Sequence, residues 1–299
     1  MNAVQELIIA PKEHGMFYFA LQSSSIDLSA KLLSEMSSLG SSLFDLPLEE
    51  KLQYDIDTLG GLKTNGRNVG GLPGQRDGFA SYTVHTPPSS VLGVDDEPFP
   101  RPAEINERWD TLHRFATTCS DGALVILRAL SNNLNLPTDR TLESLHSQSG
   151  SILNTMRMLR YETNDSRGPH PFCVPRVTHT DLGSITLLFS ETPGLQICPE
   201  GSGGWFYVAP RPGCAVVNLG DATSIWSNGA FQCALHLVAS LPNTGMMERA
   251  PISPILRDCD GQEAQRTTLC EDWVRAKFVA LRGQGSKEQG QPILTGRIA

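Results

Sequence analysis

The sequence predicts a mainly β protein with flanking helices, and three observations support this prediction. Apolar residues recur at helical spacing in the first half of the chain, whereas short apolar or alternating runs fill the part after about residue 151. Gly, Pro, Asn and Asp separate these runs, as is typical of an all-β sandwich or barrel. The 299 residues are 39% hydrophobic and 19% charged, which is the ordinary balance of a folded soluble protein.

Helices are expected before residue 150. Six apolar residues recur at helical spacing after a serine run that can cap a helix: Ile26, Leu28, Leu32, Leu33, Met36 and Leu39. Pro47 is well placed to open a second, short helix in FDLPLEEKLQYD. A long helix fits residues 104–134, with Pro137 just beyond its end. Residues 60–78 contain seven glycines and are expected to form a surface loop, or else a lip over an active site.

Strands are expected after residue 150. The seven runs are ILNTMRMLRYE, SITLLF, GLQIC, WFYVA, CAVVNLG, CALHLVA and RAPISPIL. A final helix, EDWVRAKFVALR, is expected to pack against the rest of the protein and to precede a polar tail. The change of composition near residue 150 could indicate two domains. Because no linker separates the halves, a single domain over residues 1–299 is expected.

Charge and composition exclude several classes of function. The formal net charge is −8 and Lys and Arg form no cluster, which argues against a nucleic-acid groove and against an anionic membrane surface. No apolar run is long enough to cross a bilayer, and the opening MNAVQELIIAPKEHG lacks the cationic start of a secretory signal. The seven cysteines show no Cys-x-x-Cys spacing, so we expect reduced thiols in a cytoplasmic protein.

The stretch VTHTDLGSITLLF contains the residues most suited to bind a metal. His179 and Asp181 are two apart, so on an extended chain both side chains point to the same face. One imidazole and one carboxylate on the inner face of a small barrel form two-thirds of a facial triad. His236 in CALHLVA is the expected third ligand, since Ala234, His236 and Val238 share a face. A His-x-Asp pair alone is weak evidence, so the surrounding sequence decides.

Seven segments around these residues resemble those of a known family. They are HGMFYFAL, LFDLPLEEKLQ, MRMLRYE, HTDLGSITLLF, GLQI, GGWFYVAPRPGCAVVNLGDATSIWSNGAFQCALH and RAPISPILR. Together they resemble the isopenicillin-N-synthase-like group of iron(II) and 2-oxoglutarate-dependent dioxygenases. The resemblance implies a double-stranded β-helix, a cupin-like jelly roll with helices on its major sheet. The expected organisation is a mostly helical part over 1–150, a jelly-roll catalytic core over 151–257, and a C-terminal helix and tail over 258–299.

The resemblance also implies a chemistry. Iron(II) is expected at His179, Asp181 and His236, with 2-oxoglutarate and dioxygen as cosubstrates. In such enzymes, oxidative decarboxylation releases succinate and CO2, and an iron(IV)-oxo species then removes hydrogen from the substrate. The expected substrate is a small molecule, of secondary metabolism. Hydroxylation, desaturation, ring closure and ring expansion all begin with this hydrogen abstraction, so the outcome stays open.

Three residues are expected to bind 2-oxoglutarate. Arg249 aligns with the family's Arg-x-Ser strand, and its guanidinium can bind a carboxylate through two parallel bonds. Tyr161 matches the family tyrosine whose hydroxyl can reach the same carboxylate, although a packed core tyrosine explains the position nearly as well. Pro251 stands where the family has a serine and offers no hydroxyl. Ser253, two residues further on, is expected to compensate because it could face the same way.

The residues that contact the substrate are less well defined by the sequence. Arg157 shares a strand face with Tyr161 and could meet an anionic group of the substrate or satisfy a core carboxylate. Phe79, Tyr82 and Phe231 are possible apolar lining, and each is also explained by ordinary packing.

The sequence leaves two other functions open. The first is an oxidase of the same fold that uses iron but not 2-oxoglutarate. Pro251 favours it, whereas Arg249 speaks against it because an oxidase needs no partner for that carboxylate. The second is a non-catalytic binding member of the family, which the intact set of three candidate ligands opposes.

Overall fold

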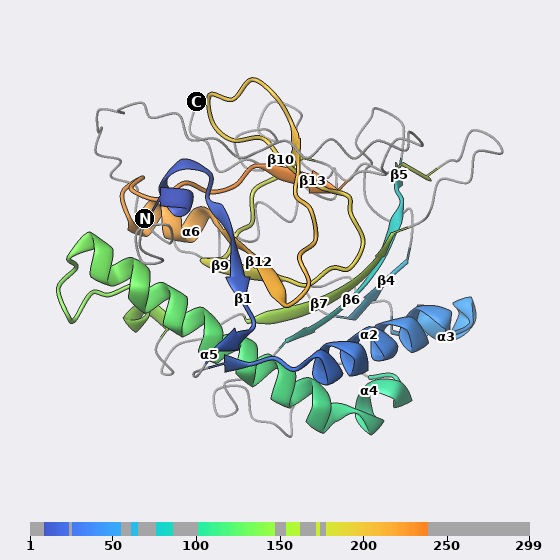
Figure 1. Ribbon diagram of the computed structural model, residues 1–299. Coiled ribbons are helices and arrows are strands. Elements are labelled where there is room, and N and C mark those ends of the chain that lie inside the picture. Colours follow the sequence, from blue (N-terminus) through green and yellow to red (C-terminus); the bar gives the residue numbers. More distant parts are fainter. Residues whose placement is uncertain are drawn as a thin grey trace. The chain divides into compact units, whose positions relative to one another are not determined.

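The computed structural model describes residues 9–23, 26–54, 61–64, 76–85, 101–146, 154–161, 172–173 and 178–238 (Figure 1). The chain divides into two compact units. The first unit comprises Met1–Phe19, Asn68–Asp77 and Asn164–Ala299, and the second comprises Ala20–Arg67 and Gly78–Thr163.

The first long helix of the second unit begins later than predicted. Helix α2 spans Ala30–Asp45, so the prediction that Ile26 and Leu28 belong to it is wrong. Ser29 is the reason, because its hydroxyl accepts a hydrogen bond from the Leu32 amide at 3.3 Å and caps the helix there. Before it, β2 (Gln22–Ser23) pairs antiparallel with β3 (Ile26–Asp27).

The other predicted helices of this unit are present. Pro47 directly precedes α3 (Leu48–Gln53), as expected. The predicted helix over 104–134 is two helices, α4 (Ala103–Glu107) and α5 (Trp109–Leu134), because Arg108 leaves the helical conformation between them. Helix α5 ends at Asn135, which adopts the left-handed conformation with a φ of 51°. A 3-10 turn, η1, follows at Ser144–His146.

A three-stranded sheet completes the second unit. Its order is β4 (Gly61–Lys63), β6 (Phe79–His85) and β7 (Thr155–Tyr161), and all pairs are antiparallel. Helix α2 packs on β6 and β7 and against α5 (Figure 1). The expected strand in ILNTMRMLRYE is confirmed as β7. The expected loop over 60–78 is corrected in part, because pairing with β6 makes Gly61–Lys63 a strand and Arg76–Asp77 forms β5.

Strands dominate the first unit. One sheet has the order β1 (Met16–Ala20), β12 (Cys214–Leu219) and β9 (Ile185–Leu188), with β12 in the middle. A second sheet has the order β11 (Phe206–Tyr207), β10 (Leu195–Ile197) and β13 (His236–Val238). Strands β5 (Arg76–Asp77) and β8 (Phe172–Cys173) pair in parallel, and α6 (Asp221–Trp226) follows β12 directly.

A small apolar core holds the first unit together. Met16, Ile197, Val216 and Ala234 are buried and pack into one cluster, so residues from β1, β10, β12 and the segment before β13 meet there. The strands expected in SITLLF, GLQIC, WFYVA, CAVVNLG and CALHLVA are confirmed. The segments RAPISPIL and EDWVRAKFVALR lie outside the described residues.

Cys119, Cys198, Cys214 and Cys233 are free thiols, and burial raises the pKa of Cys119 to about 12. Cys119 is therefore protonated and a poor nucleophile at neutral pH. None of the helices in the described part of the chain is both long enough and apolar enough to cross a membrane.

Candidate metal centre

Three predicted ligands meet in the first unit. The candidate ligand atoms of His179, Asp181 and His236 all lie within 4.8 Å of one another. Asp181 Oδ1 is 3.7 Å from Nε2 of His179 and 3.7 Å from Nε2 of His236. The two imidazole centroids are 4.4 Å apart. Both histidines are buried, whereas the Asp181 side chain is 25% exposed.

The backbone sets the spacing of the two histidines. His179 donates its amide to the His236 carbonyl at 3.1 Å, and His236 donates to the His179 carbonyl at 2.9 Å. These reciprocal bonds form an isolated antiparallel bridge, which places the two side chains directly opposite each other. His236 is also paired with Ile197 of β10, so the bridge is anchored to the second sheet of this unit.

The tautomer of His236 follows from its surroundings. Its Nδ1 lies 2.9 Å from the Ala234 carbonyl oxygen. Because a carbonyl only accepts, Nδ1 carries the proton in this contact and the lone pair is on Nε2. That nitrogen is the one that faces Asp181, which is the arrangement of a metal-binding histidine.

The loop that carries Asp181 is held against the start of α6. The Asp221 amide donates to the Asp181 carbonyl at 2.9 Å, and the Gly220 amide donates to the Ser184 carbonyl at 3.1 Å. The Thr223 hydroxyl donates to the same Ser184 carbonyl at 2.7 Å. The backbones approach so closely that a Cβ on Gly220 would lie 2.1 Å from the Gly183 carbonyl oxygen. The segment NLGDAT therefore positions the loop that follows His179.

The three residues fit a divalent metal ion. Two ligand atoms that each lie about 2.1 Å from one ion are at most about 4.2 Å apart. Both distances between the Asp181 oxygen and an imidazole nitrogen satisfy this limit, and the full set needs a closure of less than about 1 Å. Two imidazoles and one carboxylate are the donor set that non-haem iron(II) oxygenases use.

Two residues that contact Asp181 were not predicted from the sequence. Thr186 Oγ1 and Asn218 Nδ2 each donate a hydrogen bond to Asp181 Oδ2 at 2.7 Å. The sequence could have indicated Asn218, since it is the one polar residue in the otherwise apolar run CAVVNLG. A buried polar side chain in such a strand requires a partner.

Several predicted site residues lie in the second unit. Phe79 and Tyr161 are cross-strand partners of β6 and β7, and their ring centroids are 5.6 Å apart. Phe79 and Tyr82 are buried. Arg157 is exposed and donates from Nε to the Thr83 hydroxyl at 3.2 Å. Phe79, Tyr161 and Arg157 thus share one face of the β6–β7 pair, whereas Tyr82 lies on the other face.

Phe231 is the predicted lining residue that belongs to the first unit. It is fully buried, and its amide donates to the Ser227 hydroxyl at 3.1 Å.

Arg249, Pro251 and Ser253 lie outside the described residues.

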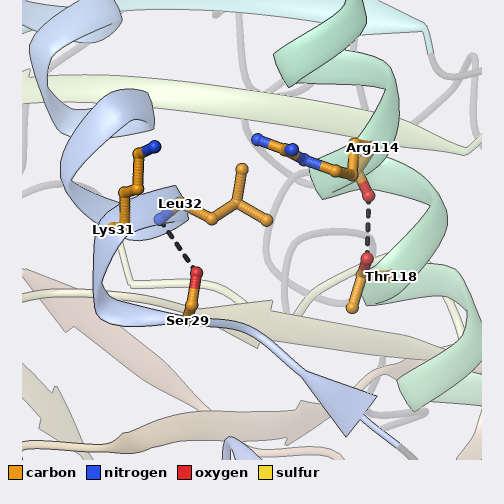
Figure 2. Close-up of a pocket in the computed structure, with 5 residues that line it drawn as sticks. All are labelled: Ser29, Lys31, Leu32, Arg114 and Thr118. Carbon is orange, nitrogen blue, oxygen red and sulfur yellow. Dashed lines mark hydrogen bonds between the residues drawn. The ribbon is translucent and has the colours of Figure 1, made fainter.

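The second unit also has a small hollow of about 200 Å³ between α2 and α5 (Figure 2). It is lined by Ser29, Lys31, Leu32, Arg114 and Thr118. Its two cations share one carboxylate, because Glu35 lies 3.8 Å from Lys31 and 3.2 Å from Arg114. Since Lys31 and Arg114 are largely exposed, this hollow lacks the buried, converging polar groups of a typical ligand site.

Comparisons with known proteins agree with this geometry. A family model described as the 2OG-Fe(II) oxygenase superfamily matches residues 150–250. A 2-oxoglutarate-dependent dioxygenase of Gibberella zeae is 28% identical, in an alignment that covers 99% of this chain and 88% of the relative. The 2-oxoglutarate-dependent dioxygenase frbH of a Dothideomycetidae species is also 28% identical, and its alignment covers 98% of this chain and 89% of the relative.

Solved structures share the fold. A full-length Neurospora crassa protein, crystallised in complex with α-ketoglutarate, superposes with a TM-score of 0.65 at 22% identity, over 81% of this chain and 74% of that one. The dioxygenase for auxin oxidation of Arabidopsis thaliana, in complex with 2-oxoglutarate, superposes with a TM-score of 0.59 at 21% identity, over 81% of this chain and 83% of that one.

The fold and the grouped ligands define the class as non-haem metal oxygenases with a double-stranded β-helix. Residues 150–250 match the 2OG-Fe(II) oxygenase superfamily, and relatives that align with nearly the whole chain are named 2-oxoglutarate-dependent dioxygenases. The protein is an oxidoreductase of the 2-oxoglutarate-dependent dioxygenase class, and this class uses iron(II) with 2-oxoglutarate and dioxygen as cosubstrates. The predicted jelly-roll fold and the predicted family are thereby confirmed.

Proposed function

We propose that this protein oxidises a small-molecule substrate of secondary metabolism at an iron(II) ion held by His179, Asp181 and His236, and that it releases succinate and CO2. The convergence of the three ligand atoms within 4.8 Å supports this proposal most directly. When bound, iron(II) supplies the site that activates dioxygen.

The protein residues have distinct tasks in this proposal. His236 offers a lone pair on Nε2 because its Nδ1 proton is committed to the Ala234 carbonyl. Asp181 contributes the single negative charge, so the ligands leave an iron(II) ion with a net charge of about +1. That residual charge favours an anionic cosubstrate such as 2-oxoglutarate. Three protein ligands also leave open positions on the ion, which the cosubstrates require.

The substrate class rests on the relatives. The Neurospora protein has also been crystallised with thymine, and the plant proteins are described as dioxygenases for auxin oxidation. Both compounds are small organic molecules, and the fungal relatives above carry the general name of 2-oxoglutarate-dependent dioxygenase. An untargeted search of a fungal extract for metabolites that the iron-loaded protein depletes would identify the substrate.

One anaerobic titration separates this function from the two alternatives. Iron(II) and then 2-oxoglutarate are added to the purified protein, and the visible spectrum is recorded. A weak charge-transfer band that saturates with 2-oxoglutarate is expected, because the keto acid chelates the ion. Iron binding without this band would favour an oxidase that does not use 2-oxoglutarate. A protein that binds no iron would be a non-catalytic binding member of the family.

We expect Arg249→Ala to raise the 2-oxoglutarate concentration needed for half-maximal band formation by orders of magnitude. Arg249 is proposed to bind the distal carboxylate, and an unpaired buried charge costs about 2–5 kcal/mol. Arg249→Lys should restore only part of the affinity, because an ammonium group is a point charge and not a planar fork. If Arg249→Ala leaves the titration unchanged, the cation lies elsewhere, and Arg257 is the next candidate.

We expect Ser253→Ala to weaken 2-oxoglutarate binding as well, by one to two powers of ten. Pro251 offers no hydroxyl, and a hydrogen bond to a charged group contributes about 1.5–3 kcal/mol, so Ser253 is proposed to replace the family serine. Pro251→Ser should strengthen binding, or make Ser253 dispensable. The same spectroscopic titration measures all three variants. Unchanged binding in Ser253→Ala would remove this residue from the cosubstrate site.

A further inference from the structure

The carboxylate of Asp181 presents its two oxygens to different groups. Oδ2 accepts hydrogen bonds from Thr186 Oγ1 and from Asn218 Nδ2, both at 2.7 Å. Oδ1 is the oxygen that lies 3.7 Å from the Nε2 atoms of His179 and His236. One oxygen is therefore held by the protein, and the other faces the two imidazoles.

The two donors come from one position of the β9–β12 ladder. Thr186 and Asn218 are direct cross-strand partners, and the flanking pairs of this ladder are apolar, Leu187 with Val217 and Ile185 with Leu219. A single polar pair in an apolar ladder thus reaches the same carboxylate oxygen from two strands. We refer to Thr186 and Asn218 as the Asp181 clamp.

The surroundings of Asn218 show that its amide has a specific use. Asn218 is only 4% exposed, and within the described part of the chain its Oδ1 has no hydrogen-bond partner. A buried polar atom without a partner costs about 1–3 kcal/mol. An apolar residue of similar size would pack here without that cost. The bond from Asn218 Nδ2 to Asp181 is what an apolar residue could not provide.

Two donors on Oδ2 also limit how Asp181 can bind a metal. A carboxylate oxygen has two lone pairs, so two hydrogen bonds use the full capacity of Oδ2. Only Oδ1 is then available to an ion. If both oxygens bound the ion, Asp181 would occupy a coordination position that a chelating keto acid or dioxygen needs.

We propose that Thr186 and Asn218 are positioning residues that restrict Asp181 to one-oxygen metal coordination and so keep the position for the cosubstrate open. This inference rests on the proposed metal centre. The clamp should then affect two separate quantities: the affinity of the protein for the metal, and the affinity of the metal-loaded protein for 2-oxoglutarate.

The test measures two affinities. Manganese(II) binding is followed by electron paramagnetic resonance. Binding of 2-oxoglutarate to the iron-saturated protein is followed, in the absence of oxygen, by the charge-transfer band. Thr186→Val keeps the shape of the side chain and removes the donor, and Asn218→Leu does the same at the partner position. Each is expected to weaken manganese binding by about 10–100-fold, the usual effect of losing a residue that orients a metal ligand. Each should also weaken 2-oxoglutarate binding at saturating iron. Thr186→Ser keeps the hydroxyl and is expected to bind both like the wild type.

Thr223→Val is the matched control. Thr223 is fully buried, and its hydroxyl donates to the Ser184 carbonyl in the loop that follows Asp181, but not to the carboxylate. This variant should lower the melting temperature and weaken manganese binding much less than Thr186→Val does. Equal losses of affinity in Thr223→Val and Thr186→Val would overturn the proposal, because general loosening of the loop would explain both.

Two further results are decisive. Unchanged manganese and 2-oxoglutarate affinities in folded Thr186→Val would overturn the clamp and leave the metal centre intact. A wild-type protein that binds no manganese would overturn the metal centre and the clamp with it. If Asn218→Leu does not fold, Thr186→Val still decides the question, because both donors act on the same oxygen.

Discussion

Alanine in place of His179, Asp181 or His236 is expected to abolish turnover and leave the protein folded. Each substitution removes one of the three proposed metal ligands, whereas the backbone bridge between the two histidines involves no side-chain atoms. Turnover is measured as succinate released from 2-oxoglutarate, and iron is measured in the same samples. Loss of a residue that merely packs would instead lower the melting temperature and spare the activity.

The three variants should differ in stability. Asp181→Ala leaves the Thr186 and Asn218 donors without their acceptor, so it should be the least stable of the set. Asp181→Asn is the better test at this position, since it keeps the shape and removes the charge. His146→Ala is a suitable control, because the His146 ring also contacts a backbone carbonyl, that of Leu142, but in the second unit. Full activity with stoichiometric iron in any ligand variant would exclude that residue as a ligand.

Gly220→Ala is expected to have the second-largest effect. A Cβ at this position would lie 2.1 Å from the Gly183 carbonyl oxygen and 2.8 Å from the Asp181 carbonyl oxygen. Both are backbone atoms, so no side-chain rotation can relieve the clash. Overpacking of this kind costs about 3 kcal/mol or more, which corresponds to a melting temperature lower by roughly 5–10 °C. Manganese affinity should fall as well, because the displaced loop carries Asp181.

Gly183→Ala is the matched control for Gly220→Ala. It lies in the same contact between the loop and α6, but a Cβ on Gly183 would meet no atom within 4 Å. The melting temperature and the manganese affinity of Gly183→Ala should therefore stay at the wild-type values. The steric argument would be refuted by a Gly220→Ala protein that melts and binds manganese like the wild type.

Much of the candidate site could be predicted from the sequence. The two-residue spacing of His179 and Asp181 places both side chains on one face of an extended chain, and the resemblance identified His236 on another strand. The strands of the first unit were predictable because short apolar runs between turn residues have few alternative structures.

Other features depend on tertiary contacts and could not be predicted in this way. The start of α2 at Ala30 depends on the Ser29 cap, which competes with an earlier serine run of similar capping ability. Strand β6 was missed because FASYTVH is a strand through its pairing with β4 and β7. The clamp on Asp181 depends on the register that sets Thr186 opposite Asn218, and register is a property of two strands together.

The reciprocal hydrogen bonds between His179 and His236 have a consequence for which metal the protein carries in the cell. They fix the separation of the two proposed histidine ligands through the main chain, so folding alone sets this separation. Two nitrogen ligands and one oxygen ligand suit several first-row divalent ions. The intrinsic affinities of these ions for such a site follow the Irving–Williams order, in which iron(II) ranks below cobalt, nickel and copper. Occupancy by iron is then decided by which ions the compartment supplies at the time the chain folds.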